Sequence, residues 1–185
     1  MSALTPPICD TGWPAPGFDL EGVDGRRHTL AEIRGPKATL VMFLCNHCPY
    51  VQAVLDDIIR DVTELKPLGL GAVAIMANDT EAYRADSFAN MKRLAAEKSL
   101  PFPYLIDPTQ QVARAYGAIC TPDIFGFDAD LGLAYRGRVR ALAGLAPVAG
   151  APREMFEAMK RIAATGQGPA DQVASLGCSI KWRAA

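Results

Sequence analysis

The stretch that decides the fold is Lys37-Ala38-Thr39-Leu40-Val41-Met42-Phe43-Leu44-Cys45-Asn46-His47-Cys48-Pro49-Tyr50-Val51. Its first part, up to Leu44, is a continuous apolar run typical of a strand buried on both faces of a sheet. From Val51 onward, apolar residues recur at helical spacing until Pro67 and Gly69, which end the predicted helix. The two cysteines therefore stand where a buried strand passes into a helix.

This position predicts redox chemistry for Cys45 and Cys48. A thiol at the start of a helix faces unpaired backbone N–H groups and the positive end of the helix dipole, which both favour the reactive thiolate. We expect Cys45 to be the attacking thiolate and Cys48, one turn further on, to resolve the mixed disulfide. Asn46, His47 and Pro49 are predicted to modulate the pair: a protonated His47 stabilises a thiolate, and proline is tolerated in the first helical turn.

Outward from this stretch, strands and helices alternate. Strands are predicted at 70–76, 104–106, 123–128 and 133–139, with a short hairpin at 18–28, and helices at 88–98, 110–116 and 153–163. This order predicts an α/β fold in which a central mixed sheet is flanked by helices. We expect three segments: an extended, proline-rich lead-in at 1–16, one domain at 17–164, and an irregular tail at 165–185.

The composition narrows the class of protein. The chain has 185 residues, enough for one domain, and a net charge of -1 that argues against nucleic-acid partners. No apolar run is long enough to span a bilayer, and no secretory signal pattern opens the sequence, so we expect a cytoplasmic protein without a membrane partner. No nucleotide-binding glycine pattern is present, and no cofactor is expected.

The active-site run resembles a known group of proteins. Pro14 to Leu20, Asp24-Gly25, and Phe43-Leu44-Cys45-Asn46-His47-Cys48-Pro49-Tyr50-Val51 are similar to the thioredoxin-like redoxins of the AhpC/TSA (alkyl hydroperoxide reductase/thiol-specific antioxidant) superfamily. Cys120-Thr121-Pro122-Asp123 and Gly177 to Trp182 are similar to one bacterial branch, which carries the CNHCPYV motif. The resemblance implies a thioredoxin-like fold with an N-terminal hairpin extension.

The resemblance also implies a thiol–disulfide oxidoreductase. Pro122 would be the cis-proline beside the cysteine pair, and with Thr121 it would shape the groove for an extended substrate. The expected partners are protein or small-molecule disulfides and an unidentified reductant. Two departures stand out: Thr39 occupies the position of the buried carboxylate that relays protons in typical thioredoxins, and the loop 140–150 lacks the acidic character of this branch.

Two alternatives remain open. The first is a peroxiredoxin-like thiol peroxidase that acts on peroxides, with Cys48 peroxidatic and Cys45 resolving; Cys48-Pro49 fits it, but Cys45 stands where the peroxide-orienting threonine belongs. The second is a non-enzymatic metal-binding or redox-sensing module. A zinc or iron–sulfur site needs further ligands, for which only His47, Cys120 and Cys178 are candidates, so no bound metal is expected.

Two further cysteines are possible accessory thiols. Cys120 would lie near the active site if Pro122 does, either as a resolving thiol or as an inert strand residue. Cys178 lies in a tail that could fold back, and a Cys120–Cys178 bridge is one possibility. Arg136, Arg138 and Arg140 alternate along the last predicted strand, which indicates a solvated edge.

Overall fold

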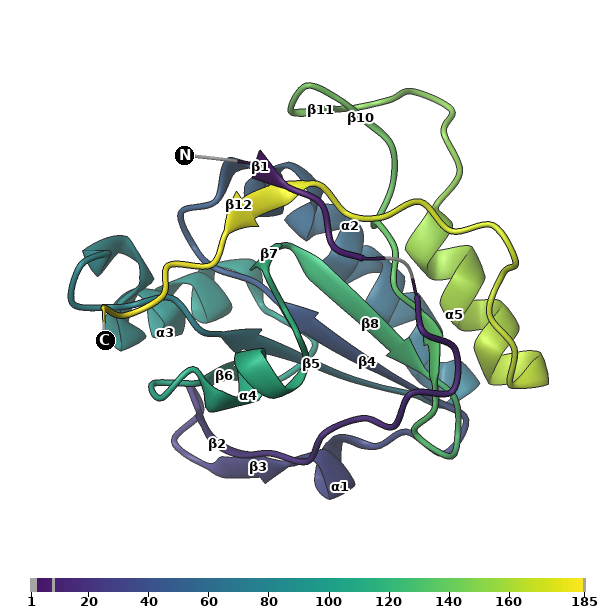
Figure 1. Cartoon of the computed structure of the whole chain (residues 1–185), viewed down its shortest axis with the longest axis horizontal. Coiled ribbons are helices and arrows are strands. Elements are labelled where there is room, and N and C mark those ends of the chain that lie inside the picture. Colours follow the sequence, from purple (N-terminus) through teal and green to yellow (C-terminus); the bar gives the residue numbers. More distant parts are fainter. Residues whose placement is uncertain (1–2, 8, 185) are drawn as a thin grey trace.

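The computed structural model describes residues 3–7 and 9–184. Its centre is a mixed sheet of seven strands in the order β3-β2-β6-β5-β4-β8-β9 (Figure 1). The strands of this sheet are β2 (Asp19–Gly22), β3 (Arg27–Thr29), β4 (Ala38–Phe43), β5 (Leu70–Met76), β6 (Tyr104–Ile106), β8 (Asp123–Phe127) and β9 (Leu133–Tyr135). The α/β fold with a central mixed sheet, predicted from the sequence, is confirmed.

Strand β4 lies in the middle of the sheet and leads to the cysteine pair. It pairs in parallel with β5 and antiparallel with β8, and all six of its residues are buried. Leu40 and Met42 belong to the core on one face, whereas Val41 and Phe43 belong to the core on the other. Burial on both faces explains why its sequence is continuously apolar rather than alternating.

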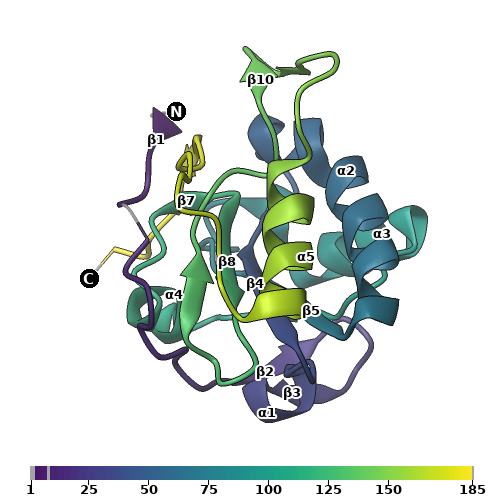
Figure 2. The ribbon, with the colours of Figure 1, turned by 90° about the vertical axis from the view of Figure 1, so that its right-hand side faces the viewer.

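Helices cover both faces of the sheet. Figure 2 shows α2 (Pro49–Leu65), α3 (Phe88–Lys98) and α5 (Glu154–Thr165) on one side, and α4 (Gln111–Ala115) on the other. The short α1 (Leu30–Ile33) follows the β2–β3 hairpin. No helix of the described residues is both long and apolar enough to cross a membrane.

Strands from the N-terminal and C-terminal segments of the chain pair with each other beside Cys120 and Thr121. A second sheet has the order β1-β12-β7 and consists of β1 (Ala3–Leu4), β12 (Gly177–Ser179) and β7 (Cys120–Thr121). The predicted lead-in and tail therefore contain one strand each, and the tail is not wholly irregular. The pairing partners of both strands are far away in the sequence, so no local pattern could reveal them.

Two predictions about the segment after β9 are wrong. The strand ends at Tyr135 instead of continuing to 139, and the loop that follows carries a small hairpin, β10 (Leu142–Ala143) with β11 (Ala146–Pro147). The arginines of this segment are not a solvated edge. Arg136 pairs with Asp123, Arg138 with Glu154, and Arg140 with Asp57.

Candidate active site

Cys45 and Cys48 lie at the carboxyl end of β4, where the chain enters α2. Cys48 is the N-cap residue of α2, and Pro49 is the first residue of the helix. Proline fits this position because its missing N–H is one that the first turn leaves unpaired. Both side chains are buried, with 1% of Cys45 and 0% of Cys48 exposed, and both are free thiols.

The Thr121–Pro122 segment lies against both sulfur atoms. The Thr121 hydroxyl is 3.2 Å from the Cys45 sulfur, and the Cys48 thiol donates a hydrogen bond of 3.0 Å to the Thr121 carbonyl oxygen. The Thr121–Pro122 peptide bond is cis. The structure therefore brings together four residues that the sequence suggested for the site, from two segments more than 70 residues apart.

Hydrogen-bond donors gather around the Cys48 sulfur. Cys45 is the strongest of them, and the thiol and backbone of Cys178 and the backbone N–H of Val51 add to its effect. Burial and the Thr121 carbonyl favour the protonated form, but the donors prevail and lower the pKa of Cys48 to about 5. These contacts therefore favour the thiolate on Cys48 over the thiolate on Cys45.

Cys45 is held in its protonated form. Its contact with Cys48 raises its pKa most, and burial and the negative charge of Asp86 raise it further. The Thr121 hydroxyl opposes this effect but does not overcome it. Cys45 thus acts as the hydrogen-bond donor within the pair.

Asp86 is a candidate functional residue that sequence reasoning missed. It is completely buried in the short 3₁₀ turn Arg84–Asp86. One carboxylate oxygen accepts the backbone N–H groups of Asn46 (2.8 Å) and His47 (3.2 Å). The other lies 2.6 Å from His47 Nδ1 and accepts a hydrogen bond of 2.8 Å from Asn78 Nδ2. Asp86 thus fixes the dipeptide between the cysteines, and no motif or periodicity in the sequence marks it.

Asn46 and His47 are held from several sides. The Tyr104 hydroxyl donates to Asn46 Oδ1 at 3.0 Å, and the His47 ring stacks on Tyr83 with centroids 5.6 Å apart. The sequence predicts that His47 stabilises a thiolate directly. Among the described residues it makes no hydrogen bond to either sulfur, and its Nδ1 lies against Asp86 instead, so this role stays a prediction. The contacts of the dipeptide place the negative charge of Asp86 near Cys45, whose pKa it raises.

A metal could draw on part of this cluster. A sulfur atom of Cys45, a ring nitrogen of His47 and a carboxylate oxygen of Asp86 lie within 4.8 Å of one another. A closed structural zinc site needs four ligands, and this group offers three. To bind an ion, His47 and Asp86 would also have to give up their mutual contact of 2.6 Å. The other ligands that the sequence suggested, Cys120 and Cys178, are not members of this group.

The remaining sequence predictions have different outcomes. Thr39 is buried, and its hydroxyl accepts a hydrogen bond of 3.2 Å from the Gly35 amide; the buried carboxylate near the pair is Asp86 instead. Cys120 is buried, and its sulfur contacts the Pro122 carbonyl oxygen at 3.5 Å. Cys178 is buried on β12 and contacts Cys48. A Cys120–Cys178 bridge is absent, because all five cysteines are free.

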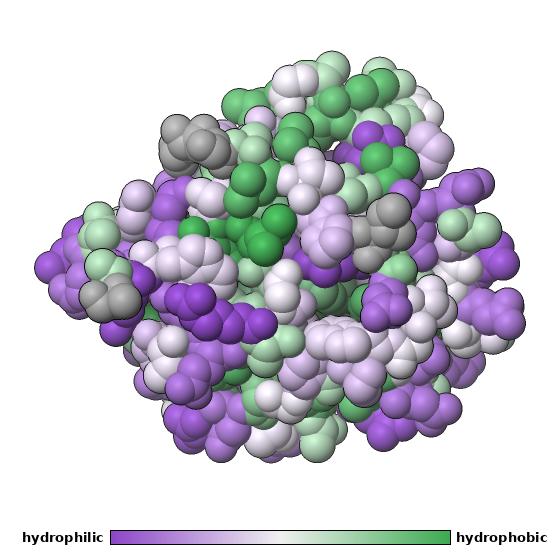
Figure 3. Space-filling model, viewed as in Figure 1, coloured by the Kyte–Doolittle hydropathy of each residue, from purple (hydrophilic) through white to green (hydrophobic). Residues whose placement is uncertain are grey.

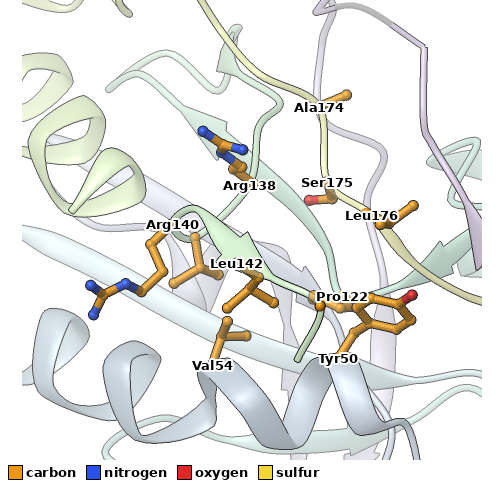
Figure 4. A pocket seen from close by; sticks show the side chains of 11 residues that line it. Tyr50, Val54, Pro122, Arg138, Arg140, Leu142, Ala174, Ser175 and Leu176 are labelled. Carbon is orange, nitrogen blue, oxygen red and sulfur yellow. The ribbon is translucent and has the colours of Figure 1, made fainter. Parts of the chain in front are cut away.

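A mainly apolar groove, which Arg138 and Arg140 also line, begins at Pro122. It has a volume of about 190 Å³ and is lined by residues of α2, the β10 hairpin and the C-terminal tail, among them Tyr50, Val54, Leu142 and Leu176 (Figure 4). Hydrophobic side chains also gather on the surface over the β10–β11 hairpin and the β1–β12 strands (Figure 3). The exposed large hydrophobic residues of these parts are Leu4, Leu145, Val148 and Leu176.

The fold and the paired thiols define a thioredoxin-like protein. A thiol:disulfide interchange protein of the thioredoxin family from Chlorobium tepidum has the same fold, with a TM-score of 0.59, 20% identity, and coverage of 82% of this chain and 93% of that chain. The model of the AhpC/TSA family matches residues 11–138, and the chain belongs to this family. Family and fold together support a thioredoxin-like redox function.

Two solved structures are similar over the whole chain. An uncharacterized conserved protein from Geobacillus kaustophilus is 40% identical, with a TM-score of 0.91 and coverage of 100% of this chain and 98% of that chain. A hypothetical protein from Sinorhizobium meliloti is 32% identical, with a TM-score of 0.91 and complete coverage of both chains. No match was found among curated proteins.

Proposed function

We propose that this protein is a thiol–disulfide oxidoreductase in which Cys45 and Cys48 cycle between dithiol and disulfide. The observation that carries the proposal is the arrangement of the two thiols: they contact each other at the start of α2, and Thr121 contacts both. A buried, acidic thiol beside a protonated one is suited to thiol–disulfide exchange, because the first attacks and the second resolves.

The contacts favour an exchange of the roles expected from the sequence. Cys48 carries the charge, so we assign it the attack on the substrate disulfide, which forms a mixed disulfide and releases the first substrate thiolate. Cys45 then attacks the Cys48 sulfur and the second substrate thiolate leaves. The proton of Cys45 passes to one leaving group, and the other takes its proton from water. A thiol reductant, not yet identified, returns the disulfide to the dithiol.

The groove at Pro122 supports a disulfide substrate with an apolar flank. Tyr50 and Pro122 lie side by side at one end of the groove, and Leu142 and Leu176 line it next to them (Figure 4). Protein disulfides next to apolar side chains and small apolar disulfides both fit this lining. Neither sulfur is exposed, so the substrate must reach Cys48 through a local displacement of the segments that cover it.

The test is oxidation of the fully reduced protein by glutathione disulfide, followed by peptide mass mapping. A Cys45–Cys48 disulfide in the wild type supports the proposal, and Cys48→Ser is expected to abolish the reaction. Cys9→Ser serves as the control, since Cys9 lies outside the site. If the wild type remains reduced with glutathione disulfide and with a small aromatic disulfide, the protein is not a thiol–disulfide oxidoreductase.

A second candidate is the thiol peroxidase, favoured by the lowered pKa of Cys48 at the start of a helix. The Cys48 thiolate would attack the peroxide, become a sulfenic acid and release the other oxygen as water or an alcohol. Cys45 would then condense with the sulfenic acid to give the disulfide and water. One feature opposes the peroxidase. The residue three positions before Cys48 is Cys45 and not a threonine, and the hydroxyl of Thr121 lies beside the Cys45 sulfur. Rate constants for hydrogen peroxide and glutathione disulfide decide between the two: the peroxidase requires the peroxide reaction to be faster by orders of magnitude than that of a free thiol.

A further inference from the structure

Strand β12 presents a third thiol to the cysteine pair. Cys178 lies directly opposite Thr121 in the antiparallel ladder between β12 and β7, and Ser179 lies opposite Cys120. Residues directly opposite each other in such a ladder point to the same side of the sheet, whereas successive residues alternate. Cys178 therefore points to the side of Thr121, whose hydroxyl contacts Cys45, and away from the side of Cys120.

The packing agrees with this register. Cys45, Cys48 and Cys178 belong to one core cluster, in which all three are almost completely buried. The Cys48 sulfur contacts the Thr121 carbonyl oxygen, and Thr121 is the residue directly opposite Cys178 in the ladder. The effects of both other thiols on the pKa of Cys48 agree with this closeness. The Cys48 sulfur thus lies between two thiols, and either can attack it.

We propose that Cys178 is a second resolving thiol, which forms a disulfide with Cys48. The inference rests on the proposed function, since the substrate disulfide is the oxidant. After Cys48 has formed the mixed disulfide, the Cys178 thiolate attacks the Cys48 sulfur. The Cys48–Cys178 bond forms, the bond between Cys48 and the substrate sulfur breaks, and the substrate leaves as a thiolate that takes up the proton of Cys178.

The product differs from the Cys45–Cys48 disulfide in its effect on the structure. A Cys48–Cys178 disulfide ties β12 covalently to the start of α2, beside the groove that Leu176 lines. Cys45 remains a free thiol in this state. The protein then has two oxidised forms, one in which hydrogen bonds alone hold β12 between β1 and β7 and one in which a disulfide also fixes it.

The experiment compares Cys45→Ser with the double variant Cys45→Ser/Cys178→Ser after addition of glutathione disulfide. In C45S, we expect a Cys48–Cys178 peptide in the mass map and a glutathione adduct on Cys48 that decays about tenfold faster, or more, than in the double variant. The matched control is Cys45→Ser/Cys120→Ser, which should form the same peptide as C45S, since Cys120 points to the other side of the ladder.

Each other outcome has a definite meaning. An adduct on Cys48 of C45S that is as long-lived as in the double variant overturns the role of Cys178, even when the wild type forms Cys45–Cys48. A wild type that remains reduced with disulfides overturns the proposed function and this inference together. If C45S does not fold, partial oxidation of the wild type gives the answer: a Cys48–Cys178 peptide must appear, and it must be missing in Cys178→Ser.

Discussion

Cys48 owes its acidity first to the Cys45 thiol, and then to the Cys178 thiol and the backbone N–H groups of Val51 and Cys178. We expect the ultraviolet absorbance of the thiolate to titrate with a midpoint near pH 5, the pKa of Cys48. Alkylation of Cys48 should accordingly slow as the pH falls through this value. Cys45→Ala removes the strongest donor, so the midpoint should move to higher pH.

The control for this titration is Cys120→Ser, which leaves the donors around Cys48 in place and should not move the midpoint. Cys48→Ser should remove the transition altogether. A wild-type midpoint near pH 9, the ordinary value for a thiol, would contradict the proposed charge distribution.

Asp86 is the residue on which the dipeptide between the cysteines depends. Asp86→Asn keeps the size of the side chain but removes the charge and places an amide N–H₂ where an oxygen accepted hydrogen bonds. We expect the free energy of unfolding of the reduced protein to fall by about 2–3 kcal/mol, because hydrogen bonds to a buried charged group are lost. Urea unfolding measures it.

The same substitution changes the chemistry of Cys45. The negative charge of Asp86 raises the pKa of Cys45, so D86N should lower it. Glu81→Gln is the control, since Glu81 is an exposed carboxylate whose pairing with Arg84 is exposed as well. Equal effects of the two substitutions on stability would show that Asp86 has no special structural role.

Among single residues, the sequence predicts those whose role shows in the pattern of their immediate neighbours. Cys45 and Cys48 could be predicted because their spacing and their place between a strand and a helix are both visible in the sequence. Asp86 could not, because its importance comes from four contacts with residues that precede it by up to 40 positions. The side to which Cys178 points depends on a strand register, which is equally invisible.

Among the elements, we expect β12 to control access to Cys48, because it pairs with Thr121, whose carbonyl oxygen contacts the Cys48 sulfur. Gly177 allows it to lie close to β7: a Cβ atom at this residue would be 2.3 Å from the Thr121 carbonyl oxygen. Gly177→Ala must therefore push β12 away from Thr121. We expect faster alkylation of Cys48 by iodoacetamide and a lower thermal midpoint, measured by peptide mass mapping and by circular dichroism.

Gly17→Ala is the matched control, because a Cβ atom at Gly17 would meet nothing within 4 Å and its backbone is not left-handed. It should leave the alkylation rate of Cys48 unchanged. If G177A unfolds more easily but Cys48 is alkylated no faster in the folded state, β12 does not control access to the sulfur.

Elements could be predicted where the signal lies in their own residues. The apolar run of β4 and the helical spacing of α2 gave boundaries close to the observed ones, because both are encoded in the elements' own residues. Strands β1, β7 and β12 have two or three residues each, and they exist through pairing between distant segments. Strand β9 ends early because Arg136 turns inward to a buried carboxylate, Asp123.

For the molecule as a whole, the reduced and oxidised forms should differ in how their stability depends on pH. The pKa of Cys48 is lowered to about 5 on folding from an ordinary value of 9.0. A group whose pKa is lowered on folding stabilises the folded state fully above its unfolded pKa, and this contribution is lost as the pH falls to the folded pKa. Cys45, with its raised pKa, opposes this only as the pH approaches 9, where the unfolded thiol begins to ionise.

In the oxidised form neither Cys45 nor Cys48 binds a proton, so this contribution is missing. The free energy of unfolding of the reduced form, minus that of the oxidised form, should therefore increase from pH 5 to pH 8. The disulfide also restricts the unfolded chain, which changes the free energy of unfolding of the oxidised form. This change is the same at every pH, so it does not alter how the difference between the two forms varies with pH. Urea unfolding of both forms across this range gives the slope, and reduced Cys48→Ser should lose it. A difference that is independent of pH would mean that folding leaves the Cys48 thiol with its ordinary acidity, and the attack on the substrate would then pass back to Cys45.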